Sequence, residues 1–165
     1  MCASPLRRRA HRREPSQPLR PIAYRLSNQS LASARPVRRR RTRRLVLIVD
    51  DSLHTRSLYS EYLTFRGLGA VSAADGGSAL VMARALRPDV IVMDLAMPGI
   101  DGITATRQLK ADPRTRSIPV VILTGFGYRA IEQGALESGA DLFLTKPCLP
   151  EDLEQEILRL IARRT

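Results

Sequence analysis

Residues 89–102 have the sequence Asp-Val-Ile-Val-Met-Asp-Leu-Ala-Met-Pro-Gly-Ile-Asp-Gly. After Asp89 the stretch is apolar and rich in β-branched residues up to Met93, which is typical of a buried parallel strand. Asp94 follows at once, so its carboxylate lies at the strand end where open α/β sheets place their chemistry. Pro98, Gly99 and Gly102 then favour a turn. The alternative for Asp94 is a helix cap or turn residue, and the rest of the chain decides between the two.

Four further segments resemble this strand, and helix-like segments separate them. The expected strands cover residues 45–49, 69–73, 89–93, 118–123 and 141–144. The first expected helix begins after Ser52, and the last begins at Pro150. The three helices between them are expected at residues 77–86, 103–110 and 128–138. Such alternation demands right-handed crossovers and a parallel sheet covered on both faces. We therefore predict a doubly wound α/β fold with five parallel strands in the order 2-1-3-4-5.

Charge divides the chain into two segments of different composition. Residues 1–44 contain fourteen arginines, no lysine and one acidic residue, Glu14. Residues 45–165 contain thirteen basic and fifteen acidic residues. The first segment has too few apolar residues to offset the entropy of ordering, so we predict a disordered Arg/Pro-rich tail. The second is long enough to form one folded domain with an ordinary core.

Three interpretations of the tail at residues 1–44 stay open. A basic arm of this kind can bind nucleic acid or another anionic surface. An Arg-rich start that is poor in acids is also typical of an organellar transit peptide. In the third interpretation the tail has no dedicated role, or translation begins further in, at a codon such as that of Val37 or Leu45.

The cysteines and the hydropathy of the chain exclude several other classes. Cys2 and Cys148 are the only cysteines in the sequence, and Cys2 lies in the predicted tail, so neither a disulfide framework nor a metal site is suggested. No apolar run approaches the length that spans a bilayer. The expected compartment is therefore a reducing cytoplasm.

Polar side chains follow four of the predicted strands. Asp50 and Asp51 follow the first strand, Asp94 the third, Thr124 the fourth and Lys146 the last. In the order 2-1-3-4-5 these strand ends meet near the topological switch point. Three carboxylates together favour a hard divalent cation with oxygen ligands, above all Mg²⁺.

This set of groups fits phosphoryl transfer to an aspartate. One carboxylate can act as the nucleophile and form an aspartyl phosphate. Transfer needs an in-line nucleophile and positive charge on the phosphoryl oxygens, which Mg²⁺ and Lys146 would supply. The hydroxyl of Thr124 can bind one phosphoryl oxygen. The added charge of about −1.5 to −2 is enough to draw a hydroxyl-bearing loop into a new position.

These motifs together resemble a receiver domain of the two-component response-regulator family, and the resemblance covers residues 45–163. This part of the chain is similar to the single-domain chemotaxis-type regulators. The matching motifs, in family order and spacing, are Asp50-Asp51, Asp94 with Met97-Pro98-Gly99-Ile100-Asp101-Gly102, Thr124-Gly125 and Lys146-Pro147.

The resemblance implies a flavodoxin-like fold and specific roles for the site residues. It implies that a histidine kinase or a histidine phosphotransfer protein phosphorylates Asp94. It also implies a Mg²⁺ ion bound by Asp50, Asp51, Asp94 and the backbone carbonyl of Ala96. The Lys146-Pro147 bond is often cis in this family, whereas cis is a minority state elsewhere.

Phe143 matches the switch aromatic of the family. Its inward rotation is expected to accompany the movement of Thr124 toward the phosphoryl group. The alternative is an ordinary core aromatic in the last strand. The chain also departs from the family pattern: Cys148 stands where Phe is common, and Gly125 where Ala is common.

Ala96 and Phe126 occupy positions that tune dephosphorylation in the family. The methyl group of Ala96 cannot position an attacking water, and the ring of Phe126 can shield the site. We therefore predict a long-lived phosphoryl group.

From this resemblance we expect a stand-alone receiver that switches the binding of a downstream protein and is not itself an enzyme. The alternative is a nucleic-acid-associated regulator that contacts DNA or RNA through residues 1–44. A dehalogenase-like phosphatase would need Asp-x-Asp at its nucleophile. Here Leu95-Ala96 follows Asp94, which argues against that class.

Overall fold

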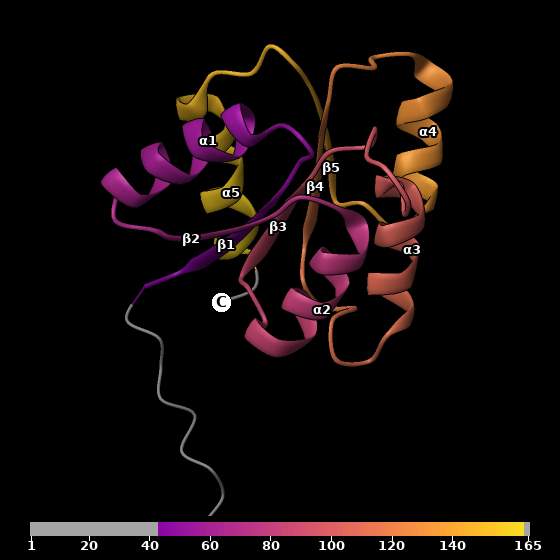
Figure 1. The fold of residues 1–165 in the computed structure, drawn as a ribbon, viewed down its shortest axis with the longest axis horizontal. Helices are drawn as coiled ribbons and strands as arrows, with labels where there is room; N and C mark the ends of the chain where they lie inside the picture. Colours follow the sequence, from indigo (N-terminus) through magenta and orange to yellow (C-terminus); the bar gives the residue numbers. More distant parts are fainter. Residues whose placement is uncertain (1–42, 164–165) are drawn as a thin grey trace, which may run out of the picture. The chain divides into compact units, whose positions relative to one another are not determined.

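A single parallel sheet forms the centre of the computed structural model, which describes residues 43–163 (Figure 1). The sheet has five strands in the order β2-β1-β3-β4-β5, and each neighbouring pair is parallel. The strands are β1 (Leu45–Val49), β2 (Gly69–Ala73), β3 (Val90–Met93), β4 (Val120–Thr124) and β5 (Leu142–Thr145). The predicted flavodoxin-like fold and its strand order are confirmed.

Five helices alternate with the strands and cover both faces of the sheet. They are α1 (Leu53–Phe65), α2 (Gly76–Leu86), α3 (Gly102–Ala111), α4 (Arg129–Glu137) and α5 (Pro150–Ala162). Helices α1 and α5 lie on one face, and α2, α3 and α4 lie on the other (Figure 1). Strands buried on both faces need apolar residues, and β1, β3 and the first four residues of β4 have them at every position.

Side-chain caps mark the starts of α1 and α2. The Ser52 hydroxyl accepts a hydrogen bond from the Thr55 amide at the start of α1. Helix α2 is capped in the same way. Its cap is Asp75, whose carboxylate accepts the Ser78 amide at 2.8 Å.

Three predicted strands begin one or two residues later than expected. Asp89 and Asp141 stand just before β3 and β5, and their carboxylates accept the backbone N–H groups of Leu45 and Val120 at 2.8 and 2.9 Å. These side chains therefore complete the hydrogen bonding of neighbouring strands in place of the strand ladder. Before β4, Pro119 has no N–H to give to a ladder.

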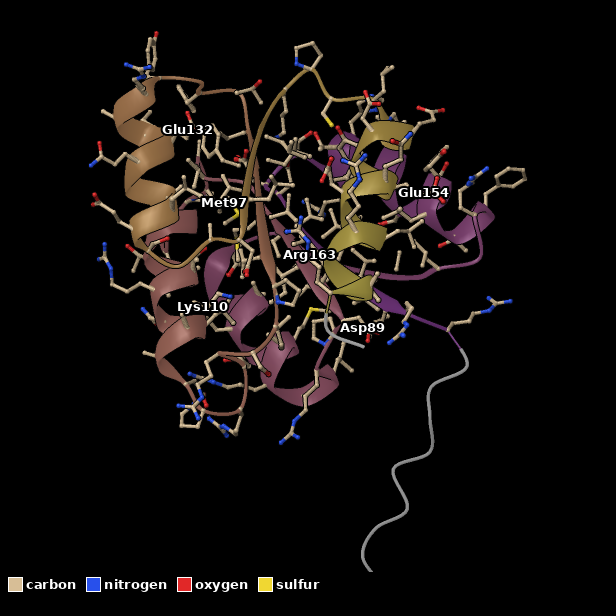
Figure 2. All side chains as sticks on the ribbon, turned by 180° about the vertical axis from the view of Figure 1, so that it is seen from behind. Asp89, Met97, Lys110, Glu132, Glu154 and Arg163 are labelled. Atoms are coloured by element: carbon tan, nitrogen blue, oxygen red, sulfur yellow. The ribbon has the colours of Figure 1, made fainter. Side chains whose placement is uncertain are left out.

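Helices α1 and α5 are joined through a buried carboxylate, that of Glu154. It accepts hydrogen bonds from the Tyr62 hydroxyl and the Arg66 Nε, both at 3.0 Å. Figure 2 shows Glu154 on the side of α5 that meets α1. Because both partners come from α1, this contact fixes the packing of the two helices on that face of the sheet.

Some predictions fall partly outside the described residues. The predicted tail lies there except for Arg43 and Arg44, so its disorder and its binding to nucleic acid stay predictions. None of the helices between residues 43 and 163 has the length and apolar character needed to cross a membrane.

The packing of α1 predicts a contrast between two of its leucines. Leu63 is fully buried in the cluster that α1 shares with α5, whereas Leu58 is 45% exposed. We expect Leu63→Ala to lower the free energy of unfolding by about 2–5 kcal/mol, because it leaves a cavity. Leu58→Ala should change it by about 0.5 kcal/mol at most. Urea unfolding measures both, and equal losses would contradict this packing.

Candidate functional site

Three residues from separate strand ends meet at the carboxyl edge of the sheet. Asp50 follows β1, Asp94 follows β3 and Lys146 follows β5. The Lys146 Nζ lies 2.6 Å from Asp50 Oδ2 and 3.1 Å from Asp94 Oδ1. Because β1 and β3 are hydrogen-bonded neighbours, the two carboxylates are brought side by side. The predicted convergence of these three side chains is therefore confirmed.

Burial makes the electrostatics of this cluster strong. Asp50 is 3% exposed and Asp94 is 6% exposed. Burial raises the pKa of Asp94; the nearby Lys146 ammonium opposes the rise, and the negative charge of Asp50 adds to it. Burial alone would lower the pKa of Lys146, but its bonds to Asp50 and Asp94 outweigh that effect and raise the pKa. Two carboxylates thus share one ammonium.

Backbone N–H groups hold the second oxygen of each carboxylate. Asp50 Oδ1 accepts the Ser52 amide at 2.8 Å, and Asp94 Oδ2 accepts the Ala96 amide at 3.0 Å. Both carboxylates are therefore oriented from two sides, and neither rotates without losing a hydrogen bond.

Asp51 differs from the other two aspartates. Its side chain is exposed, and the structure does not group it with Asp50 and Asp94. Within residues 43–163, no three His, Cys, Asp or Glu side chains are gathered closely enough to hold a metal ion. The proposed role of Asp51 as a metal ligand therefore stays a prediction.

The buried pair of acids still fits Mg²⁺ by its chemistry. Mg²⁺ prefers hard oxygen ligands, and it is typically held by one or two carboxylates while it keeps several waters. Asp50 and Asp94 offer two oriented carboxylates, and one ammonium leaves an excess negative charge between them. That excess negative charge attracts a divalent cation.

The turn between β3 and α3 holds Ala96 beside Asp94, and glycines make it fit. The Gly102 amide donates to the Leu95 carbonyl at 3.1 Å. A Cβ at Gly102 would lie 2.1 Å from the carbonyl oxygen of Asp94, so no other residue fits there without a shift of the backbone. Gly99 has φ of +77°, which favours glycine. The predicted turn is confirmed.

Thr124 and Phe143 lie on the neighbouring strands. Thr124 is the last residue of β4, and its buried hydroxyl accepts the Phe126 amide at 3.4 Å. Its carbonyl accepts the Lys146 amide at 2.8 Å, which ties β4 to the lysine loop. Phe143 in β5 is partly buried against the core cluster under α2, α3 and α4. The peptide bond between Lys146 and Pro147 is cis.

Two supporting residues were not predicted from the sequence. Arg56 in α1 donates to the backbone carbonyls of Asp50 and Asp51 at 2.7 and 3.0 Å, which fixes the backbone of the acid pair. The Tyr59 hydroxyl donates to the Cys148 carbonyl at 2.8 Å. An arginine one turn into the helix that follows two acids is a sequence signal that could have identified Arg56. No sequence signal indicates which group the Tyr59 hydroxyl binds.

Comparison with known proteins gives consistent relatives. Residues 46–158 match the family model described as the response regulator receiver domain. Response regulator PleD of Caulobacter vibrioides is 46% identical over 102 residues, which is 62% of this chain and 22% of PleD. The chain thus spans about a fifth of the length of that relative. Protein PilH of Pseudomonas aeruginosa is 38% identical over 117 residues, 71% of this chain and 97% of PilH.

A solved structure agrees with this match. It is the receiver domain of the sensor histidine kinase PA1611 from Pseudomonas aeruginosa PAO1, which has a magnesium ion coordinated in its active site cleft. The two chains are 28% identical, and the TM-score is 0.68. The match covers 73% of this chain and 92% of the other.

The raised pKa of Asp94 predicts a pH-dependent effect of Asp94→Asn. The folded protein binds a proton at Asp94 more readily than the unfolded chain, so this group destabilises the fold as the pH rises through its folded pKa. Asparagine does not ionise. We therefore expect Asp94→Asn to stabilise the fold at pH 7 and to do so less at pH 4, as measured by urea unfolding.

Asp101 provides a control of opposite sign. Its hydrogen bond from the Thr104 amide lowers the pKa of its carboxyl, so Asp101→Asn should destabilise the fold at pH 7 and less so at pH 4. A loss of stability in Asp94→Asn that grows with pH would contradict the assigned electrostatics.

Proposed function

The chain belongs to the response-regulator receiver domain family, and we propose that it is a switch that accepts a phosphoryl group on Asp94. The donor is a histidine kinase or a histidine phosphotransfer protein. The observation that carries the proposal is the Lys146 ammonium bound to both Asp50 and Asp94 at a sheet edge. Because the phosphoryl group ends on the protein's own side chain, the chain acts as a switch and not as a turnover enzyme.

Asp94 is the proposed nucleophile. One of its carboxylate oxygens attacks phosphorus in line with the leaving nitrogen of the donor histidine, and the P–N bond breaks as the new P–O bond forms. The Ala96 amide holds one carboxylate oxygen at 3.0 Å and orients the group. Lys146 lies where it can shift from the carboxylate to the phosphoryl oxygens without leaving Asp50.

Mg²⁺ is the proposed cofactor. Asp50, Asp51, Asp94 and the carbonyl of Ala96 would hold it, and when bound it would neutralise charge on the phosphoryl oxygens. The excess negative charge of the buried acids supports this proposal. The magnesium ion in the PA1611 receiver domain supports it as well.

Thr124 and Phe143 are the proposed moving parts. The Thr124 hydroxyl oxygen accepts only a long hydrogen bond, at 3.4 Å, from the Phe126 amide, and its own O–H can donate to a phosphoryl oxygen. A Cβ at Gly125 would meet nothing within 4 Å, which leaves space beside Thr124. Phe143 is only partly buried against the core, and its inward rotation is the second proposed movement. Such a motion would change the surface offered to a downstream protein.

Phosphorylation by a small-molecule donor tests the assignment of Asp94. We expect acetyl phosphate to phosphorylate the wild type in the presence of Mg²⁺ and not in its absence. Asp94→Ala should abolish the transfer because the nucleophile is lost, as followed by intact-protein mass spectrometry. Asp75→Ala, which removes the N-cap of α2, should still be phosphorylated. Transfer that survives Asp94→Ala would refute the proposal.

The lifetime of the phosphoryl group is the second prediction. Ala96 cannot hold an attacking water and the Phe126 ring can shield the site, so we expect slow loss of phosphate from the isolated protein. Phe126→Ala should shorten the half-life several-fold, measured by the decay of the phosphorylated mass. Tyr128→Ala, in the same loop and 72% exposed, is the matched control. Rapid loss from the wild type, or no effect of Phe126→Ala, would contradict this account.

A further inference from the structure

The position of the Lys146 ammonium depends on the loop that carries it. A lysine side chain has a long flexible stem, so its charge is only as well placed as its backbone. The loop between β5 and α5 contains Pro147, which has no N–H to anchor it. Other groups must therefore hold this loop in place.

Two hydrogen bonds to the residues on either side of Pro147 fix this part of the loop backbone. On the β5 side, the Lys146 amide donates to the Thr124 carbonyl at 2.8 Å. On the α5 side, the Tyr59 hydroxyl donates to the Cys148 carbonyl, also at 2.8 Å. The first bond continues the strand pairing, whereas the second comes from a side chain on a helix that is remote in sequence.

Tyr59 is itself held firmly. It is 4% exposed and packs in the core cluster between the sheet, α1 and α5. Helix α1, which carries Tyr59, begins three residues after Asp50, so the position of Tyr59 is tied to that of Asp50. Burial is the main cause that raises the pKa of Tyr59. The positive charge of Lys146 lowers this pKa, and the negative charge of Asp50 raises it. The hydroxyl therefore stays protonated and remains a donor.

We propose that Tyr59 is a positioning residue: its hydroxyl fixes the Cys148 carbonyl and thereby aims the Lys146 ammonium at Asp50 and Asp94. The inference rests on the proposed function in assigning that ammonium to phosphoryl transfer. Tyr59 does not touch the reacting atoms. It sets the distance between α1, which follows Asp50, and the loop that carries Lys146.

A neighbouring tyrosine separates this role from simple helix packing. Tyr62 lies on the same helix, and its hydroxyl donates a hydrogen bond to the Glu154 carboxylate of α5 at 3.0 Å. Tyr62→Phe thus removes a comparable hydroxyl and leaves the lysine loop untouched. It is the matched control for Tyr59→Phe, and thermal unfolding checks that both variants stay folded.

Lysine labelling reads the position of Lys146 without any phosphorylation. The chain has two lysines, Lys110 and Lys146, and Lys110 is an internal reference because it is bound to Asp141 at 2.7 Å. We expect Tyr59→Phe to raise the rate of acetylation of Lys146 relative to Lys110 roughly three- to tenfold, the effect of losing about one hydrogen bond. N-acetoxysuccinimide and peptide mass spectrometry measure this ratio.

The outcome of the labelling decides the inference. Tyr62→Phe should leave the ratio unchanged. An unchanged ratio in Tyr59→Phe, or an equal rise in Tyr62→Phe, would overturn the positioning role.

Phosphorylation by acetyl phosphate with Mg²⁺ is the second readout. Tyr59→Phe should slow it roughly three- to tenfold, and Tyr62→Phe should leave it unchanged. An undiminished rate in Tyr59→Phe would overturn the inference. A wild type that is not phosphorylated would refute the proposed function alone, because the labelling ratio still tests Tyr59.

Discussion

The bond of one ammonium to two buried carboxylates is the interaction on which the site depends. Asp50 and Asp94 are almost completely buried, and two such charges repel each other unless a cation joins them. Lys146 supplies that cation from β5, at the far edge of the sheet from β2. The strand order brings the ends of β1, β3 and β5 to one edge, so the topology of the whole sheet serves this contact.

Much of the fold could be predicted from the sequence because its strands are strongly apolar and β-branched. Strands buried on both faces, such as β1 and β3, give a signal that no surface segment imitates. The strand starts were less predictable. Asp89 and Asp141 replace part of the strand ladder with their side chains, and a sequence pattern does not show which backbone amide a carboxylate will accept.

Part of the site could be predicted from the sequence and part could not. The meeting of Asp50, Asp94 and Lys146 follows from topology alone, because parallel strands end at a common edge. The exposure of Asp51 and the contact from Tyr59 to the lysine loop do not follow from it, since they depend on side-chain positions that only the packed structure fixes. The sequence therefore predicted which side chains meet at the sheet edge better than it predicted the residues that hold them.

The most direct test of this account is to locate the phosphoryl group on the chain. Borohydride reduces an aspartyl phosphate to homoserine, which peptide mass spectrometry can assign to one position. After treatment with a phosphodonor and Mg²⁺, the account predicts homoserine at position 94 alone. Homoserine at position 50 or 51, or its absence from a phosphorylated protein, would contradict it.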